Sequence, residues 1–449
     1  MISMSKNEGD WYAKSSAWRP KEEVMYMENL RKSLDWGKPE AVYDRVKQLY
    51  RLHDDFRERS CINLVASENV MSPMAKAYLG SNLGFRVCDG HVGKKIFGAG
   101  IQYLEELEAI CIEASRRLFK AEYVEHRLLS GTMGCAAVQY ALAKNGDTVM
   151  SQSSDAGGVV CNRPEGPPKH IGLKVVDIPW NSEKMNVDLE AFEKVAKETR
   201  PRVVILGAMI TLFPYPVREI AKISKDLGAR VAYDGAHIGG LVAGNRFQDP
   251  LGEGSDLLMV NTHKQMGGPP GALILSNDEA VARSISETTF PFLVATPYCN
   301  KFAALAVTLS ELMEYGAEYA EQIIRNAKAL ARELDDLGVT VMCRSLGYTE
   351  SHQVLLDVRG YGGGFEAENR LAKAHIICNK MPLPGDSLVE RSGLRLGVNE
   401  VTRRGMKEKH MKDLAGFVSR ALAEGGQDRI GLEVADYMKD YQKVRYCFE

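Results

Sequence analysis

The chain has 449 residues, of which 45% are hydrophobic and 26% are charged, and its formal net charge is −2. This composition is typical of a folded globular protein and excludes a disordered chain or a strongly basic one that binds polyanions. The first residues lack the apolar segment of a signal peptide, and no stretch reaches the roughly 18 apolar residues of a membrane span. We therefore expect a cytoplasmic protein with two or three domains.

Residues 1–60 are polar and contain one helical pattern, at residues 39–60, so we expect an N-terminal arm with a helical segment. From about residue 100 helices and strands alternate. Apolar residues at helical spacing predict helices at residues 103–121, 189–199 and 217–229. Short β-branched runs predict strands at residues 146–152, 172–180, 202–209, 229–238, 256–263 and 271–276. Continuous apolar strands between amphipathic helices favour a mostly parallel sheet covered on both faces.

The pattern changes after residue 299. A long helix at residues 299–338 is followed by predicted strands at 339–344 and 352–358, a helix at 365–380, a strand at 393–398 and a terminal helical stretch. The expected fold is α/β, with a large domain and a smaller C-terminal α+β domain. The predicted divisions are residues 1–60, 61–299 and 300–449.

The nine cysteines form no CxxC pair, and their odd number argues against a complete disulfide framework. We expect buried free thiols. The nine histidines show no metal-binding spacing, so no metal is expected. We interpret His91, His170 and His352 as loop or surface residues.

Three polar features follow predicted strands. Asp234 ends one strand, Lys264 follows the next strand, and the Ser130-Gly131-Thr132 run begins a helix. Each has an ordinary explanation alone: a turn former, a solvated lysine and a helix cap. Ligands of open α/β sheets bind beyond the carboxyl ends of the strands, where a helix N-terminus can hold an anion. Pyridoxal 5′-phosphate needs all three features, because it carries a phosphate, a pyridine nitrogen and an aldehyde that reacts with lysine.

Five segments then reveal a family resemblance: INLVASENVMS, SGTMGCAAVQYAL, YDGAHIGGLVAG, VNTHKQMGGPPGALIL and GLRLGVNEVTRRGM. Their order and spacing over about residues 60–420 resemble the serine hydroxymethyltransferases. These are fold-type-I, aspartate-aminotransferase-like enzymes that use pyridoxal phosphate. The resemblance implies the same fold and cofactor for this chain.

The resemblance also implies roles for individual residues. Lys264 would form the internal aldimine, Asp234 would pair with the pyridine N–H, and His237 would lie near the phenolic oxygen. The phosphate would be held by Ser130, Gly131 and Thr132, and His263 next to the lysine is also assigned to the cofactor site. Arg395 would bind the substrate carboxylate in a bidentate manner, assisted by Ser67. Relatives are dimers or dimer-based tetramers with shared sites, which implies a homodimer or such a tetramer here, with the arm wrapping a partner.

The sequence departs from the family at positions that serve folate and protons at the substrate β-carbon. Val87 replaces a tyrosine, Asp89 a glutamate, and Ile96 and Phe97 a pair of tyrosines. Phe97 remains assigned to the substrate site.

Two further departures affect the cofactor site. Ala156 lies where the family stacks a histidine on the cofactor ring. A glycine-rich loop that reaches the partner's phosphate has become FPFLVATP, in which Thr296 could donate a hydroxyl.

We therefore expect an enzyme that makes or breaks the Cα–Cβ bond of a β-hydroxy-α-amino acid through a glycine quinonoid, with a carbonyl compound as second substrate. Folate-independent aldolase or transaldolase chemistry is favoured, and a role for tetrahydrofolate is in doubt. The alternatives are folate-dependent serine hydroxymethyl transfer, other chemistry of the cofactor such as transamination, decarboxylation or β-substitution, and a non-catalytic paralogue. Asp89, Glu68 and His237 are the candidates for moving the β-hydroxyl proton.

Overall fold

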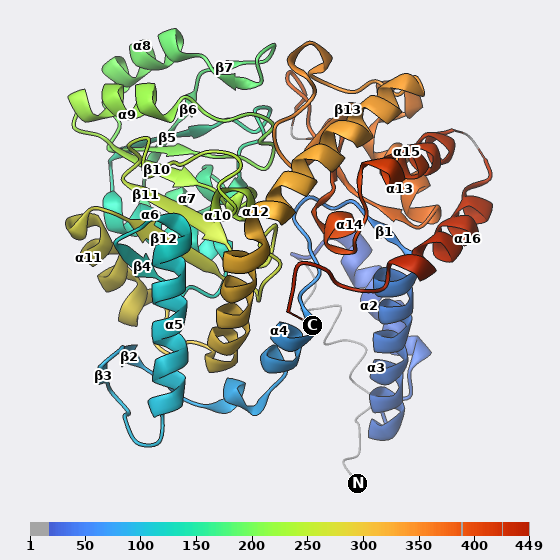
Figure 1. Cartoon of the computed structure of the whole chain (residues 1–449), viewed down its shortest axis with the longest axis horizontal. Helices are drawn as coiled ribbons and strands as arrows, with labels where there is room; N and C mark the ends of the chain where they lie inside the picture. Colours follow the sequence, from blue (N-terminus) through green and yellow to red (C-terminus); the bar gives the residue numbers. More distant parts are fainter. Residues whose placement is uncertain (1–17, 388, 424, 449) are drawn as a thin grey trace. The chain divides into compact units, whose positions relative to one another are not determined.

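The computed structural model describes residues 18–387, 389–423 and 425–448. The chain separates into two compact units, Met1–Ser60 and Cys61–Glu449, and each is described by itself (Figure 1). The predicted division of the second unit at residue 299 remains a prediction. Within the described residues, no helix is both long and apolar enough to span a bilayer.

The described residues of the first unit, 18–60, contain two α-helices, one more than predicted. Helix α3 (Pro39–His53) and the π-helical turn η1 (Asp54–Ser60) fall within the predicted segment, whereas α2 (Lys21–Ser33) was not predicted. Helix α2 has acidic residues in its first turn and basic residues in its last, which suits the helix dipole. None of its side chains is buried, which is also true of α3.

A seven-stranded sheet forms the centre of the second unit. Its order is β4-β12-β11-β10-β9-β5-β6, and β11, β10, β9, β5 and β6 run parallel. Strand β12 is antiparallel to both of its neighbours, β11 and β4. The prediction of a mostly parallel sheet is confirmed. The strands are β4 (Tyr123–Glu125), β5 (Thr148–Gln152), β6 (Lys174–Ile178), β9 (Val203–Leu206), β10 (Arg230–Asp234), β11 (Leu257–Asn261) and β12 (Ala272–Ser276).

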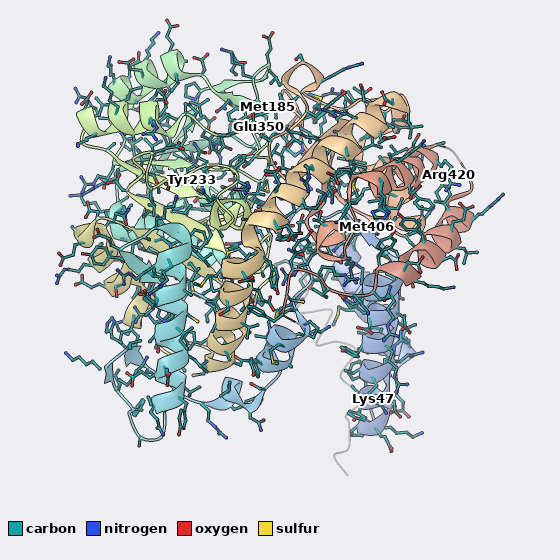
Figure 2. All side chains as sticks on the ribbon, viewed as in Figure 1. Lys47, Met185, Tyr233, Glu350, Met406 and Arg420 are labelled. Atoms are coloured by element: carbon teal, nitrogen blue, oxygen red, sulfur yellow. The ribbon has the colours of Figure 1, made fainter. Side chains whose placement is uncertain are left out.

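Helices cover both faces of this sheet because each strand directs alternate side chains to opposite faces. In β10, Val231 and Tyr233 belong to the apolar cluster under α5 (Gln102–Phe119), α8 (Leu189–Thr199), α9 (Val217–Asp226) and α12 (Cys299–Asp336). Ala232, between them, packs in the cluster with α6 (Gly131–Leu142) and α11 (Glu279–Glu287). Tyr233, labelled in Figure 2, lies in the first of these two clusters and directly precedes Asp234 in the sequence.

A smaller antiparallel sheet, β13-β16-β15, is formed by the C-terminal part of the chain. Its strands are β13 (Gln353–Asp357), β15 (Asn379–Met381) and β16 (Gly393–Gly397), with α13 (Gly363–Lys373), α15 (Glu408–Leu422) and α16 (Gln427–Tyr437) nearby. Helix α12 packs on α5 at one end and on α15 further along, so it connects the two sheets (Figure 1). Strand β1 (Ile62–Asn63) pairs with β14 (Ile376–Ile377), which brings the segment before Ser67 to this part of the fold.

Two predicted elements near the small sheet were wrong. Residues 339–344 make only an isolated bridge, from Val341 to Leu356, because Cys343 has a φ of +60° and ends extended structure. The helix predicted for residues 365–380 ends at Lys373, because His375 has a φ of +57°. The residues beyond it form β14 and β15 instead.

The remaining short elements connect these layers. The helices are α4 (Pro73–Leu79), α7 (Pro167–Ile171), α10 (Gly239–Ala243) and α14 (Asn399–Arg403), and the strands are β2 (Gly90–His91), β3 (Lys94–Lys95), β7 (Trp180–Asn181) and β8 (Asn186–Val187). The single turns are η2 (Asn82–Phe85), η3 (Val160–Asn162), η4 (Thr288–Leu293), η5 (Arg344–Leu346), η6 (Arg359–Tyr361) and η7 (Met438–Tyr441). None of the nine cysteines, all of which lie in the described residues, forms a disulfide, and three are only half-buried: Cys161, Cys343 and Cys447.

Candidate active site

The carboxyl ends of β10 and β11 place Asp234 and Lys264 at one edge of the large sheet. The two strands are parallel neighbours, with Asp234 opposite Met259, and Lys264 follows the end of β11. The loop after β11 is closed by hydrogen bonds from Thr262 N to Gly271 O (3.1 Å) and from Gly268 N to Thr262 O (2.8 Å). The lysine is therefore carried by a loop that the backbone holds in one shape.

Asp234 is a buried acceptor surrounded by donors. Its carboxylate accepts from Ala236 N (3.1 Å), from Asn162 Nδ2 (3.0 Å) and, more weakly, from Cys135 Sγ (3.7 Å). Burial raises the pKa of Asp234, while the nearby Lys264 and these hydrogen bonds oppose the rise. The donors favour the ionised carboxylate, the form that can pair with a protonated ring nitrogen.

The Lys264 amine faces His237. Lys264 Nζ lies 3.1 Å from His237 Nε2, and both side chains lie close enough to Arg395 for its charge to affect them. Burial lowers the pKa of Lys264, and burial together with the Lys264 charge holds the pKa of His237 well below its usual value. The imidazole is therefore neutral, and the neutral, nucleophilic form of the amine is favoured.

The predicted anion-binding residues lie at the N-terminus of α6. Ser130 caps the helix, its hydroxyl accepting from Met133 N at 3.2 Å. The N–H groups of Gly131 and Thr132, in the first turn, have no intrahelical acceptor and remain open to an anion. A Cβ at residue 131 would collide with the Asn261 side chain at the end of β11, so glycine is required for this close approach. The helix start is thereby fixed against the strand that precedes Lys264.

Arg395 projects from β16 as a buried cation without a carboxylate partner in the described part of the chain. Its guanidinium donates to Met209 O (2.5 Å) and to Asn379 Oδ1 (2.8 Å), and its buried Nε has no partner. Burial lowers the pKa of Arg395 to about 10, so it stays charged at neutral pH. An uncompensated buried charge is costly, which indicates that an anion binds here.

The segment around Ser67 packs against β16 and β13. Gly397 N donates to Leu64 O (2.8 Å), and His352 Nε2 contacts Ala66 O at 3.1 Å. Ser67 is half-buried directly after Ala66. The Glu68 carboxylate accepts from Asn63 Nδ2 at 3.0 Å.

His352 lies in a bend directly before β13, as expected of a loop residue, but the alternative of a surface position was wrong. Its side chain is fully buried beside Lys264 and Arg395, and burial lowers its pKa to about 3. His91 and His170 are exposed, as expected.

Asp89 and Thr296 pair with each other, and Phe97 is an exposed residue. Thr296 Oγ1 donates to Asp89 Oδ2 at 3.2 Å, and the Phe97 side chain is 60% exposed. Among the described residues, no hydrogen bond or ion pair joins any of these three to Lys264.

Two predicted cofactor-site residues lie beside the lysine group. Ala156 is buried, and the next residue, Gly157, accepts from Met209 N (2.7 Å), the residue whose carbonyl binds Arg395. His263 is half-buried, and burial lowers its pKa. In the described residues, no group of three His, Cys, Asp or Glu side chains is placed to hold a metal ion.

Comparison with known proteins identifies the family. The family model for serine hydroxymethyltransferase matches residues 42–418. Serine hydroxymethyltransferase from Methanothermobacter thermautotrophicus is 40% identical over 409 residues, which are 90% of this chain and 96% of that protein. The enzyme from Pyrobaculum arsenaticum is 39% identical over 401 residues, 89% of this chain and 93% of that protein.

This chain belongs to the serine hydroxymethyltransferase family. It is therefore a pyridoxal-phosphate-dependent enzyme, and members of this family are typically oligomeric and act on amino-acid substrates. The fold agrees with a solved structure, that of L-threonine transaldolase from Pseudomonas fluorescens in internal aldimine state. That structure superposes with a TM-score of 0.83 at 24% identity and covers 94% of this chain and 96% of its own. The prediction of a fold-type-I enzyme is confirmed.

The residues present fit pyridoxal phosphate. Buried polar atoms without protein partners surround the lysine: His237 Nδ1, His263 Nδ1 and Asn261 Oδ1. Together with the open amides of α6, the ionised Asp234 and the Lys264 amine, they match the phosphate, ring nitrogen and aldehyde of the cofactor.

Several residues of the site were not recognised in the sequence. Asn162, Cys135 and Cys161 surround Asp234, and Asn379 supports Arg395 from the adjacent strand. Only the pairing of β15 with β16 reveals Asn379, because the strand was predicted as helix.

Proposed function

We propose that this enzyme makes or breaks the Cα–Cβ bond of a β-hydroxy-α-amino acid, with glycine as the common amino acid and a carbonyl compound as the second substrate. The observation that carries the proposal is the buried Arg395 guanidinium, which lacks a carboxylate partner and lies beside Lys264. A substrate carboxylate at Arg395 would place an amino-acid Cα near the lysine amine.

The proposed roles follow from these contacts. When bound, pyridoxal phosphate supplies an electron sink for negative charge at Cα. Lys264 holds the cofactor covalently, Asp234 keeps its ring nitrogen protonated, and Ser130, Gly131 and Thr132 bind the phosphate. Neutral His237 accepts a proton from the lysine amine or returns one, because its Nε2 lies within hydrogen-bonding distance.

The remaining predicted residues complete these assignments. Arg395 and Ser67 bind the substrate carboxylate. Ala156 and His263 flank the cofactor, and Glu68 and Asp89 are candidates for moving the β-hydroxyl proton. The Asn63 contact of Glu68 holds its carboxylate in one orientation.

We propose that the reaction does not need folate. Phe97 has no hydroxyl, Val87 and Ile96 are aliphatic, and all three side chains are exposed rather than directed at a polar partner. Asp89 keeps a carboxylate but binds Thr296, a residue of the altered FPFLVATP segment. These replacements remove groups that the family uses at folate and at the substrate β-carbon.

We also propose a homodimer or dimer-based tetramer with shared sites. The Asp89–Thr296 pair carries predicted site functions without contacting Lys264 in its own chain. A cytoplasmic location also stays a proposal. Shared sites can be tested by co-expressing two inactive variants, Lys264→Ala and Asp89→Ala. Mixed oligomers would regain activity if each site combines both regions, and would stay inactive if one chain supplies the whole site.

Folate-dependent serine hydroxymethyl transfer is the second candidate. It is favoured by the names of the relatives that share about 40% identity with this chain. The remaining alternatives are transamination, decarboxylation or β-substitution.

One experiment separates these reactions. Purified holoenzyme is incubated with threonine, serine or glycine, with and without an aldehyde panel and tetrahydrofolate, and the products are quantified. The proposal expects aldehyde-dependent carbon–carbon bond formation without folate. Strong stimulation of serine cleavage by tetrahydrofolate would establish the second candidate, and release of a keto acid would establish transamination.

A further inference from the structure

Two thiols meet beside Asp234. The Sγ atoms of Cys135 and Cys161 lie 3.2 Å apart, and Cys135 Sγ lies 3.7 Å from Asp234 Oδ2. Cys135 belongs to α6 and Cys161 to η3, so the pair joins two elements that are distant in sequence. Both elements also supply predicted groups of the site: α6 forms the phosphate cradle and η3 carries Asn162.

The two thiols differ in exposure. Cys135 is buried, whereas Cys161 is only half-buried. The hydrogen bond within the pair, together with burial beside Asp234, raises the pKa of Cys135, and the same hydrogen bond lowers the pKa of Cys161. Since the thiolate is the reactive form of cysteine, Cys161 is the first thiol to react.

We infer that Cys135 and Cys161 form a reversible oxidative modification site, in which a disulfide between them weakens the hold of the protein on its cofactor. This inference rests on the proposed pairing of Asp234 with the cofactor ring nitrogen. The geometry that supports it is the 3.2 Å contact and its position against the Asp234 carboxylate.

The chemistry balances with a hydroperoxide as oxidant. The Cys161 thiolate attacks one peroxide oxygen, the O–O bond breaks, and Cys161 becomes a sulfenic acid while the alcohol or water leaves. The Cys135 sulfur then attacks the sulfenic sulfur, the S–S bond forms, and water leaves. Two thiols thus give two electrons and two protons to the peroxide, and a dithiol reductant reverses the change.

The disulfide would disturb the contacts that hold the Asp234 carboxylate. A disulfide requires an S–S distance of about 2.05 Å, so the sulfurs must approach from 3.2 Å. This shift pulls η3, and with it the Asn162 donor, relative to α6. The thiol proton that Cys135 directs at Asp234 is lost as well. A small cavity of about 10 Å³, lined by Cys135, Asn162 and Asp234, gives the sulfur some room to turn.

The chain contains a matched control pair. Cys88 and Cys299 also lie close enough for each thiol to affect the pKa of the other, but both are fully buried, and their Sγ atoms donate to Glu108 and to Arg86 O instead. Burial from solvent should protect this second pair, so its oxidation state reports whether a treatment is selective.

The experiment treats reduced holoenzyme with hydrogen peroxide, blocks free thiols by alkylation and maps the cysteines by peptide mass spectrometry. Pyridoxal phosphate affinity is measured by equilibrium dialysis before treatment, after treatment and after dithiothreitol. We expect a Cys135–Cys161 cross-linked peptide, a rise of about tenfold in the cofactor Kd, and recovery with dithiothreitol. Cys161→Ser and Cys135→Ser should lose the response, each compared with its own untreated sample, whereas Cys299→Ser should keep it.

Two results would overturn the inference: Cys161 oxidised to sulfinic acid with Cys135 still a free thiol, or a disulfide that leaves the cofactor Kd unchanged. Neither readout depends on turnover. Failure of the proposed carbon–carbon chemistry would appear in the products of the reduced enzyme, so the two failures are distinguishable.

Discussion

The lysine region and the Asp89 region of this protein are built in opposite ways. Around Lys264, most side chains are buried, Asp234 and the lysine amine have defined neighbours, and the loop is closed by backbone hydrogen bonds. Around Asp89, Phe97 is 60% exposed and Val87 46% exposed, and the pair with Thr296 is the polar contact that orders the carboxylate. Apart from Ala156, the first region keeps the residues that the resemblance assigns to the cofactor, whereas the second has changed at Val87, Asp89, Ile96 and Phe97. This difference is the basis of our proposal that the cofactor chemistry is kept and the second substrate has changed.

The largest effect should come from Lys264→Ala. Loss of the amine removes the covalent link to pyridoxal phosphate, and we expect kcat to fall by about 10³-fold. Borohydride reduction followed by intact-mass measurement should find cofactor fixed to the wild type and to the exposed control Lys222→Ala, but not to the variant. If borohydride reduction still attached the cofactor to the Lys264→Ala variant, another lysine would form the covalent link.

Arg395→Lys should have the next largest effect. Lysine keeps the charge but cannot form two parallel hydrogen bonds to a carboxylate, which costs roughly 1.5–3 kcal/mol for a charged pair. We expect the KM for the amino acid to rise by about 10–100-fold while the absorbance of the bound cofactor stays unchanged. An unchanged KM would assign the substrate carboxylate to another residue.

Restoring the lost hydroxyls tests the changed region. In the double variant Val87→Tyr/Phe97→Tyr, we expect the stimulation of serine cleavage by tetrahydrofolate to increase, by up to about tenfold. Exposed positions tolerate such changes within about 0.5 kcal/mol of stability. The exposed control Phe365→Tyr, in α13, should not alter the response to folate. If serine cleavage by the wild type already depends fully on tetrahydrofolate, and the double variant shows no greater stimulation, the proposed loss of folate use in the Asp89 region is contradicted.

The smallest effect at neutral pH concerns His352. Its pKa is about 3 in the folded protein and about 6.5 in an unfolded chain, so the unfolded state binds more protons between these values. The stabilisation is complete above pH 6.5 and is lost as the pH falls towards 3. In urea unfolding, the free energy of unfolding should fall less steeply with decreasing pH for His352→Gln than for wild type. His170→Gln, at the exposed α7 position, should show the same pH dependence as wild type.

Local patterns in the sequence were sufficient for much of the fold. Short, nearly continuous runs of β-branched apolar residues indicated β5, β6, β9, β10, β11 and β12, and helical spacing indicated α5, α8, α9 and the long α12, because these segments face a core. The C-terminal strands β14 and β15 were missed, since the left-handed backbone of His375 ends α13 within a sequence that otherwise favours helix.

The candidate site also has one part that was predicted from the sequence and another that was not. The sequence by itself determined that Asp234, Lys264 and the start of α6 belong together, because the carboxyl ends of parallel strands meet at one edge of a sheet. Only the tertiary structure decided that His352 is buried beside Arg395, that Cys135 and Cys161 touch next to Asp234, and that Asp89 and Thr296 pair away from Lys264. Those relations join residues from separate elements, and side-chain contacts between such elements depend on packing that no local pattern records.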